Sequence, residues 1–177
     1  MKNARSKNLV IDASVARASG GEGATHPTSV ITRNFLQAVL TICHKAVMTP
    51  AIRDEWNQHQ SGYARTWRRS MMARRKLILL DVEERQDVRQ PVELEDITPE
   101  QKDAMLKDCH LIEAAITTDK QIVSLDDTAR KLFVGLSNRV ADIQDVMWVN
   151  PASDTEQVMA WLEGGQEDAR WKLAHNS

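Results

Sequence analysis

Short runs of apolar residues recur along the chain, and most of them end at a polar residue or a proline. The first is Asn-Leu-Val-Ile at residues 8–11, which ends at Asp12. Runs of this length that are rich in β-branched residues are typical of buried strands. We therefore predict strands at residues 8–11, 46–48, 77–80, 121–125 and 146–149. The run at 77–80 is also compatible with the end of a helix.

Helical periodicity fills the stretches between these runs. After a glycine-rich loop at residues 20–27, apolar residues from Ile31 to Ile42 recur at helical spacing and predict the first crossover helix. A second helix is expected to begin near Ala51 and to carry Glu55 in an early turn. Further helices are predicted over residues 63–76, 128–136 and 154–162.

A helix start signal lies near the middle of the chain. Thr98 can cap the helix, Pro99 suits its first position, and Gln101 completes a capping box. Asp108 precedes an apolar helical face over residues 111–116. This helix therefore brings an acidic residue close to the expected core.

Alternating strands and helices favour an α/β fold. Such chains form a mostly parallel sheet with helices on both faces, a three-layer α/β/α sandwich. The length of 177 residues fits one domain, which we place at residues 1–165. The polar residues 84–96 are expected to form a solvated connection, and residues 166–177 a loose tail after two glycines.

Composition argues against a membrane-spanning or exported protein. Hydrophobic residues make up 42% of the chain, and no stretch approaches the roughly 18 consecutive apolar residues of a membrane span. The apolar run behind the basic N-terminus is too short for a secretory signal. Cys43 and Cys109 lie far apart without a partner at zinc-ligand spacing, so neither a zinc site nor a disulfide framework is indicated. We expect a cytoplasmic protein.

Charge is distributed unevenly within a chain whose net charge is −2. Residues 61–76 contain no acid, whereas residues 81–103 contain nine acids and three bases. A localised basic segment suits a polyanion such as RNA, an acidic partner chain or the acidic segment of a second subunit. The candidate nucleic-acid-binding residues are Arg65, Arg68, Arg69, Arg74 and Arg75, followed by Lys76.

Two acidic residues stand where strands are predicted to end. Asp12 follows the first run and Asp126 the fourth, and ligands of parallel α/β sheets bind beyond the carboxyl ends of the strands. Several carboxylates can share a site when a hard cation such as Mg²⁺ or Mn²⁺ offsets their repulsion. Such an ion can polarise a phosphate and activate water, which indicates hydrolysis of phosphodiester bonds. The five histidines are interpreted as structural or exposed.

Four segments in order resemble a PIN-domain ribonuclease of the toxin-like bacterial or archaeal type. They are Leu-Val-Ile-Asp-Ala-Ser at 9–14, Thr-Pro-Ala-Ile-Arg-Asp-Glu at 49–55, Asp-Cys-His-Leu-Ile-Glu-Ala-Ala at 108–115 and Ile-Val-Ser-Leu-Asp at 122–126. The resemblance covers roughly residues 8–150. It implies that Asp12, Asp108 and Asp126 bind Mg²⁺ or Mn²⁺. Glu55 would complete the acid cluster, and Ser14 would orient Asp12 or a bound water.

The resemblance also implies an activity and partners. Family members hydrolyse single-stranded or structured RNA and leave a 5′-phosphate and a 3′-hydroxyl. Many are dimers, and many are the toxin of a toxin–antitoxin pair, so an antitoxin protein is a candidate partner. Other roles are defence effector and RNA processing. The alternatives are a silent PIN-like module for RNA binding or assembly, and a metal-dependent DNA nuclease of the related flap-endonuclease group.

Two positions of the acid cluster have alternative residues nearby in the sequence. Asp54 is an alternative to its neighbour Glu55, and both Asp119 and Asp127 are alternatives to Asp126. Asp126 can also cap the next helix, and Asp108 can be a first-turn acid favoured by the helix dipole.

Overall fold

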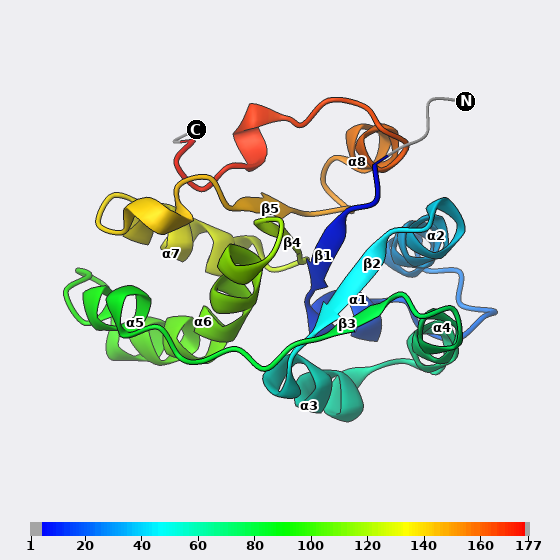
Figure 1. The fold of residues 1–177 in the computed structure, drawn as a ribbon, viewed down its shortest axis with the longest axis horizontal. Coiled ribbons are helices and arrows are strands. Elements are labelled where there is room, and N and C mark those ends of the chain that lie inside the picture. Colours follow the sequence, from blue (N-terminus) through cyan, green and yellow to red (C-terminus); the bar gives the residue numbers. More distant parts are fainter. Residues whose placement is uncertain (1–4, 176–177) are drawn as a thin grey trace.

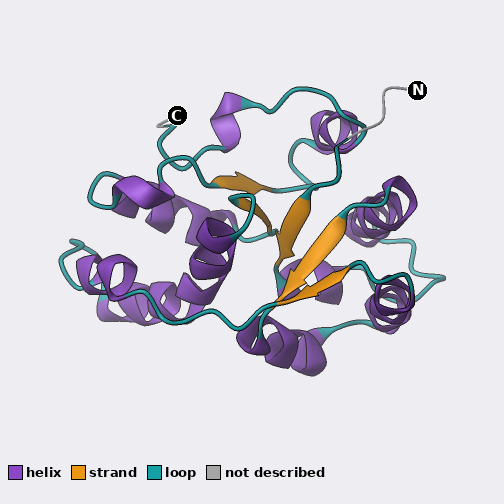
Figure 2. Ribbon diagram, viewed as in Figure 1, coloured by secondary structure: helices purple, strands orange, loops and turns teal. Residues whose placement is uncertain are grey.

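In the computed structural model, which describes residues 5–175, the chain folds around a five-stranded sheet that forms the central layer (Figure 2). The strands are all parallel and lie in the order β3-β2-β1-β4-β5. All five predicted strands are confirmed, including the one at 77–80. They are β1 (Asn8–Ile11), β2 (Lys45–Met48), β3 (Leu77–Leu79), β4 (Gln121–Val123) and β5 (Met147–Val149).

Helices cover both faces of this sheet, so the fold is a three-layer α/β/α sandwich (Figure 1). Helices α2, α4 and α8 lie on one face, where α2 packs against the other two, and α6 and α7 lie on the opposite face. The eight α-helices of residues 5–175 are α1 (Ala13–Ala18), α2 (Pro27–Ile42), α3 (Pro50–His59), α4 (Gly62–Ala73), α5 (Gln86–Val92), α6 (Pro99–Thr117), α7 (Asp127–Ser137) and α8 (Thr155–Leu162). Two short 3₁₀ helices, η1 (Ala141–Ile143) and η2 (Ala169–Trp171), complete the described elements.

The central strands are buried on both sides because helices cover both faces of the sheet. Leu9 and Val10 of β1 and Ile122 and Val123 of β4 are fully buried. A polar side chain can reach solvent from these strands only at their ends. The first polar residue after β1 is Asp12, so the burial pattern itself places this carboxylate at the edge of the sheet.

Helix α6 is longer than its apolar face suggested. The predicted capping box is confirmed: Thr98 accepts from the Gln101 amide at 3.2 Å, and the Gln101 side chain accepts from the Thr98 amide at 2.9 Å. The helix then runs without a break for 19 residues. Asp108 therefore lies in its middle, and the interpretation of Asp108 as a first-turn acid is wrong.

The prediction of a solvated connection at residues 84–96 is wrong. Residues Gln86–Val92 form helix α5, and Val88 and Val92 are fully buried where α5 packs on α6. This helix was not predicted because its other residues are polar and only two valines, at a spacing of four, mark its buried face. Pro91 lies inside this short helix, where its missing N–H removes the hydrogen bond that residue 91 would donate to the Asp87 carbonyl.

The prediction of a loose tail after residue 165 is also wrong. Trp171 is 3% exposed and Leu173 is fully buried. The Leu173 amide donates to the Val146 carbonyl at 2.9 Å, and the Trp171 ring packs edge-on against Trp161. The tail is held because β5 is an edge strand with backbone groups free to pair. Residues 176–177 lie outside the described part of the chain.

The short helix α1 was not predicted. It begins directly after Asp12, and its residues Val15 and Ala16 are buried. Six residues of the sequence Ala-Ser-Val-Ala-Arg-Ala are too few to show a periodicity. Among residues 5–175, no helix combines the length and the hydropathy that crossing a bilayer requires.

Candidate active site

A cavity of about 210 Å³ lies at the carboxyl ends of β1 and β4. Strand β1 pairs with β2 on one side and β4 on the other, so the strand order reverses here and leaves a crevice beside their ends. All five residues that the sequence singled out for catalysis line this carboxylate cavity. They are Asp12, Ser14, Glu55, Asp108 and Asp126.

Two serine hydroxyls hold Asp12. Ser14 Oγ donates to Asp12 Oδ2 at 2.5 Å, and Ser124 Oγ donates to the same oxygen at 2.8 Å. Each hydroxyl is itself fixed by a backbone amide: Ser14 Oγ accepts from Leu125 N at 3.1 Å and Ser124 Oγ from Asp126 N at 3.0 Å. Because both donors use Oδ2, the second oxygen of Asp12 is available to a ligand. Ser124 belongs to the fourth PIN-like segment, residues 122–126, but it was not predicted as a site residue.

Asp126 has a second role as the N-cap of α7. Its Oδ1 accepts from the Ala129 amide at 2.8 Å, as the sequence allowed. The carboxylate is exposed and lines the cavity at the same time. Capping uses one oxygen and fixes the side chain, so Oδ2 can face a cation.

A buried tryptophan places Glu55 beside the end of β1. Helix α3 begins at Pro50 with Thr49 as its cap, whose hydroxyl accepts from Ile52 N at 3.2 Å. One residue after Glu55, the fully buried Trp56 donates from Nε1 to the Ile11 carbonyl at 2.9 Å. This bond ties α3 to the residue before Asp12. The alternative, Asp54, is 64% exposed and pairs with Arg53 at 3.5 Å, so it is not the residue that lines the cavity.

Asp108 shares a face of α6 with the residues that pack on the sheet. Leu111, Ile112 and Ala115, which follow it at helical spacing, are buried, and α6 packs on both β1 and β4. Burial, followed by the negative charge of Asp12, raises the pKa of Asp108 to about 7. The carboxylates of Glu55 and Asp126 act in the same direction. The four acids are thus close enough to repel one another.

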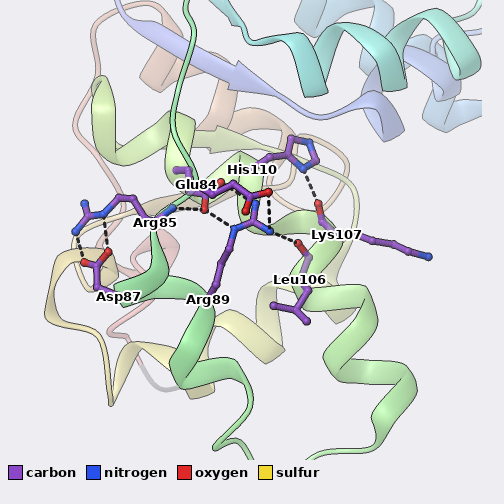
Figure 3. Close-up of polar contacts among 8 residues, drawn as sticks. Glu84, Arg85, Asp87, Arg89, Leu106, Lys107 and His110 are labelled. Atoms are coloured by element: carbon purple, nitrogen blue, oxygen red, sulfur yellow. Dashed lines mark hydrogen bonds and ion pairs between the residues drawn. The ribbon is translucent and has the colours of Figure 1, made fainter.

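His110 forms an ion pair with Glu55. Its Nε2 lies 3.3 Å from Glu55 Oε2, and its Nδ1 lies 2.6 Å from the Lys107 carbonyl (Figure 3). Nδ1 must donate to that carbonyl, so a proton on Nε2 makes the ring an imidazolium that faces the carboxylate. Burial lowers the pKa of His110, but Glu55, the Lys107 carbonyl and the charge of Asp108 together outweigh this effect, so the net shift is upward. The interpretation of this histidine as merely structural or exposed missed its contact with the acid cluster.

A second network holds α5 against α6 (Figure 3). Glu113, which is 3% exposed, accepts from Arg89 Nε at 2.7 Å and from Arg89 Nη2 at 3.0 Å. It also accepts from the Arg85 amide at 2.8 Å. Glu84 adds a longer ion pair to Arg89 at 3.6 Å. The network therefore braces the helix that carries Asp108.

The two remaining alternative acids lie elsewhere. Asp119 accepts from the amide of Asn8 at 2.9 Å, at the start of β1 and therefore at the opposite edge of the sheet. Both oxygens of Asp127 accept from Asn150 Nδ2 at 3.1 Å. Asp127 lines a neighbouring cavity, so the structure supports Asp126 as the fourth acid.

The structure divides the five candidate arginines. Arg65, Arg68 and Arg69 lie on α4, whereas Arg74 and Arg75 precede β3 and so lie at the amino ends of the strands. Burial lowers the pKa of Arg68, and its positive neighbours, Arg53 foremost among them, lower it further. We call Arg53, Arg65, Arg68 and Arg69 the arginine cluster. Within it, Arg53 lies on the opposite face of α3 from Glu55, because residues two apart in a helix point in nearly opposite directions.

Arg17 and His59 also line the carboxylate cavity, but neither was predicted as a site residue. Arg17 lies one turn after Ser14 in the unpredicted helix α1. His59 lies one turn after Glu55 in α3. Spacings of three and four residues place side chains on one helical face, and this is the signal that would have found both residues.

The donor set of the cavity fits a hard divalent cation. Carboxylate oxygens are the ligands that Mg²⁺ and Mn²⁺ prefer, and the raised pKa of Asp108 is the repulsion that such an ion would relieve. Within residues 5–175, no three His, Cys, Asp or Glu side chains are already gathered as a metal-binding group. Comparison of the chain with protein-family models, curated proteins and solved structures gave no match.

Proposed function

We propose that this chain is a metal-dependent endoribonuclease that hydrolyses phosphodiester bonds in the carboxylate cavity. The observation that carries the proposal is the convergence of Asp12, Glu55, Asp108 and Asp126 on one cavity from four separate elements. A set of mutually repelling carboxylates destabilises a fold, so it needs a compensating charge. A divalent cation is the ligand that best explains this arrangement.

Bound Mg²⁺ or Mn²⁺ would supply the positive charge that polarises the phosphate and makes water a usable nucleophile. Asp12, Asp108 and Asp126 would hold this ion. Ser14 and Ser124 orient Asp12, and the helix cap orients Asp126. In the proposed reaction, water attacks phosphorus and the P–O3′ bond breaks. The products are a 5′-phosphate and a 3′-hydroxyl.

The basic residues of the cavity have separate roles in this proposal. Arg17 is a cation on the rim and suits the phosphate of the strand. His110 faces Glu55 and offsets one negative charge of the acid cluster.

RNA is the proposed substrate because the four acidic segments resemble PIN-domain ribonucleases. The arginine cluster supplies phosphate contacts on the far side of α3, where a strand that leaves the cavity over this helix would pass. A DNA nuclease of the flap-endonuclease group would be expected to use further acids for a second metal, and the sequence offers Asp119 and Asp127 for this role. Asp119 is bonded to Asn8 and Asp127 to Asn150, so neither supports that alternative.

Cleavage assays with a matched pair of variants test the proposal. Labelled single-stranded RNA and DNA are incubated with the protein in Mn²⁺ or in EDTA. We expect Mn²⁺-dependent cleavage of RNA that Asp108→Asn lowers by about 100-fold or more, because the lost carboxylate is both a metal ligand and a fixed charge. Asp103→Asn, an exposed acid on the same helix, should leave the rate unchanged.

The other outcomes discriminate between the functions. Metal-dependent cleavage of DNA alone would contradict the choice of RNA and favour the DNA nuclease. Binding of RNA without cleavage in any divalent metal would favour a silent RNA-binding module. Cleavage that Asp108→Asn leaves intact would place the chemistry outside this cavity.

A further inference from the structure

A second cavity, of about 320 Å³, adjoins the carboxylate cavity. Trp148 lines both, and the consecutive residues Asp126 and Asp127 line one each. We call the second one the side cavity. Its polar lining residues are Asp127, Arg130, Lys131, Asn150, Ser153, Asp154 and Arg170.

Helix α7 presents a mixed charge to the side cavity. Asp127, Arg130 and Lys131 are spaced by three and four residues, so they lie on one face of the helix. Arg130 Nη2 donates to the Arg170 carbonyl at 2.5 Å, which holds the guanidinium in place. Within residues 5–175, neither Arg130 nor Lys131 forms an ion pair with a carboxylate. Their positive charge is therefore available to a ligand.

The acids of the side cavity are held by neutral donors. Asp127 accepts from Asn150, and Asp154 Oδ2 accepts from Trp171 Nε1 at 3.2 Å. These carboxylates keep lone pairs that can accept from hydroxyl or amino groups. The cavity thus offers cationic side chains to an anion and carboxylates to hydrogen-bond donors.

A nucleotide combines these two properties in one molecule. Its phosphate is anionic, and its ribose and base carry hydroxyl and amino donors. The volume of the side cavity, about 320 Å³, lies within the range of about 300–1,000 Å³ that is usual for small-molecule sites. An inorganic phosphate alone would leave Asp127 and Asp154 without a donor from the ligand.

The wall between the two cavities contains an unpartnered donor. Trp148 is 1% exposed and its ring stacks on Phe133, but its Nε1 has no hydrogen-bond partner among the described residues. Buried N–H groups without a partner are rare in folded proteins. Nε1 is fully enclosed, so a ligand across this wall could supply the missing acceptor only if the Trp148 ring moved.

We propose that the side cavity binds one nucleotide of the RNA strand, next to the bond that is cleaved, with its phosphate on Arg130 and Lys131. This inference rests on the proposed function, since it extends the path of the substrate of the carboxylate cavity. The strand would pass over Trp148 from one cavity into the other.

Binding measurements in EDTA test this subsite without cleavage. Fluorescence anisotropy with a short labelled oligouridine compares wild type, Lys131→Gln and the double variant Arg130→Gln/Lys131→Gln. The dissociation constant should rise about tenfold in the double variant, which lacks the charge-assisted hydrogen bonds to phosphate. The slope of log affinity against log salt should become shallower by about 0.7 for each phosphate that is no longer neutralised by a cationic side chain. Lys131→Gln, which changes one exposed side chain, should show an intermediate effect.

A charge-matched control separates a specific site from general attraction. Arg5→Gln/Lys45→Gln removes two exposed charges at the opposite edge of the sheet, before β1 and at the start of β2, and should leave affinity within about twofold. In a second series, a neutral methylphosphonate replaces each phosphate of the oligonucleotide in turn. Wild type should bind more weakly when one or two adjacent linkages are neutral, and the double variant should not respond at those linkages.

Three results would overturn the subsite: equal weakening in the double variant and the control, unchanged affinity in the double variant, or no dependence on linkage in wild type. These failures differ from that of the proposed function. If Asp108→Asn abolishes RNA cleavage but the α7 variants bind as wild type does, only the subsite is wrong. If RNA is never cleaved, the binding differences still decide whether the side cavity holds a nucleotide.

Discussion

Asp108 lies half-buried among three other carboxylates, and its pKa of about 7 follows from that position. Burial disfavours its charge first, and the negative charge of Asp12 adds to the effect. His110 opposes both, but too weakly to restore the ordinary pKa of 3.8. In the metal-free protein, the ionised form of Asp108 is therefore a source of instability.

The pH dependence of stability follows from this shift. A proton on Asp108 stabilises the folded state because the folded pKa, about 7, exceeds the ordinary value of 3.8. The stabilisation is complete below the ordinary pKa and is lost as the pH rises through about 7. In EDTA, we expect the free energy of unfolding to be lower at about pH 8 than at about pH 5.5. Urea unfolding at the two pH values measures the difference.

Replacement of Asp108 isolates its contribution. Each pKa unit is worth about 1.4 kcal/mol, and partial exposure reduces the effect, so Asp108→Asn should stabilise the metal-free protein at alkaline pH by about 1–2 kcal/mol. The pH dependence should be flatter in this variant than in Asp103→Asn. Parallel pH profiles for the two variants would show that Asp108 is not the group responsible.

At the scale of elements, the site depends on helices that are held in place by elements packed on their outer sides. Helix α6 carries Asp108 and His110, and α5 packs on its outer side through Val88 and Val92. Between them, Arg89 and Glu113 form a buried pair with two hydrogen bonds. A buried carboxylate is stable only while its partners remain, so this pair makes α5 a support of the site.

Two glutamates that contact Arg89 provide a matched comparison. Glu113→Ala should destabilise the protein by about 3 kcal/mol, because a guanidinium would be left partly buried without its partner. Glu84→Ala should cost less than about 1 kcal/mol, since Glu84 is 65% exposed and its ion pair is long. Thermal or urea unfolding of both variants measures this. Equal effects would mean that the buried geometry of Glu113 adds nothing.

At the scale of the whole molecule, the sheet brings together residues that are remote in sequence. Parallel strands place their carboxyl ends at one edge, so the positions of Asp12 and Asp126 followed from the apolar runs before them. The capping box near Thr98 and the apolar face behind Asp108 gave the position of α6. These features were predictable because each depends on a local pattern and a general rule of topology.

Other parts of the site had no local signal. The contact between His110 and Glu55 depends on how α3 and α6 approach each other, and no spacing along the chain encodes it. Arg17 depends on α1, which is too short to show a period. Polar residues also hid α5, where Val88 and Val92 are the only buried positions of the helix. The contact and the two helices depend on packing between elements that are remote in the sequence.

The central claim is that side chains from β1, α3, α6 and the β4–α7 connection enclose one divalent cation. Calorimetric titration of Mn²⁺ into metal-free protein at about pH 8, where Asp108 has lost its proton, tests it most directly. We predict one ion bound per chain, with affinity at least about tenfold weaker in Asp108→Asn and in Asp12→Asn and unchanged in Asp103→Asn. Absence of binding by the wild-type protein, or equal affinity in all four proteins, would contradict the account.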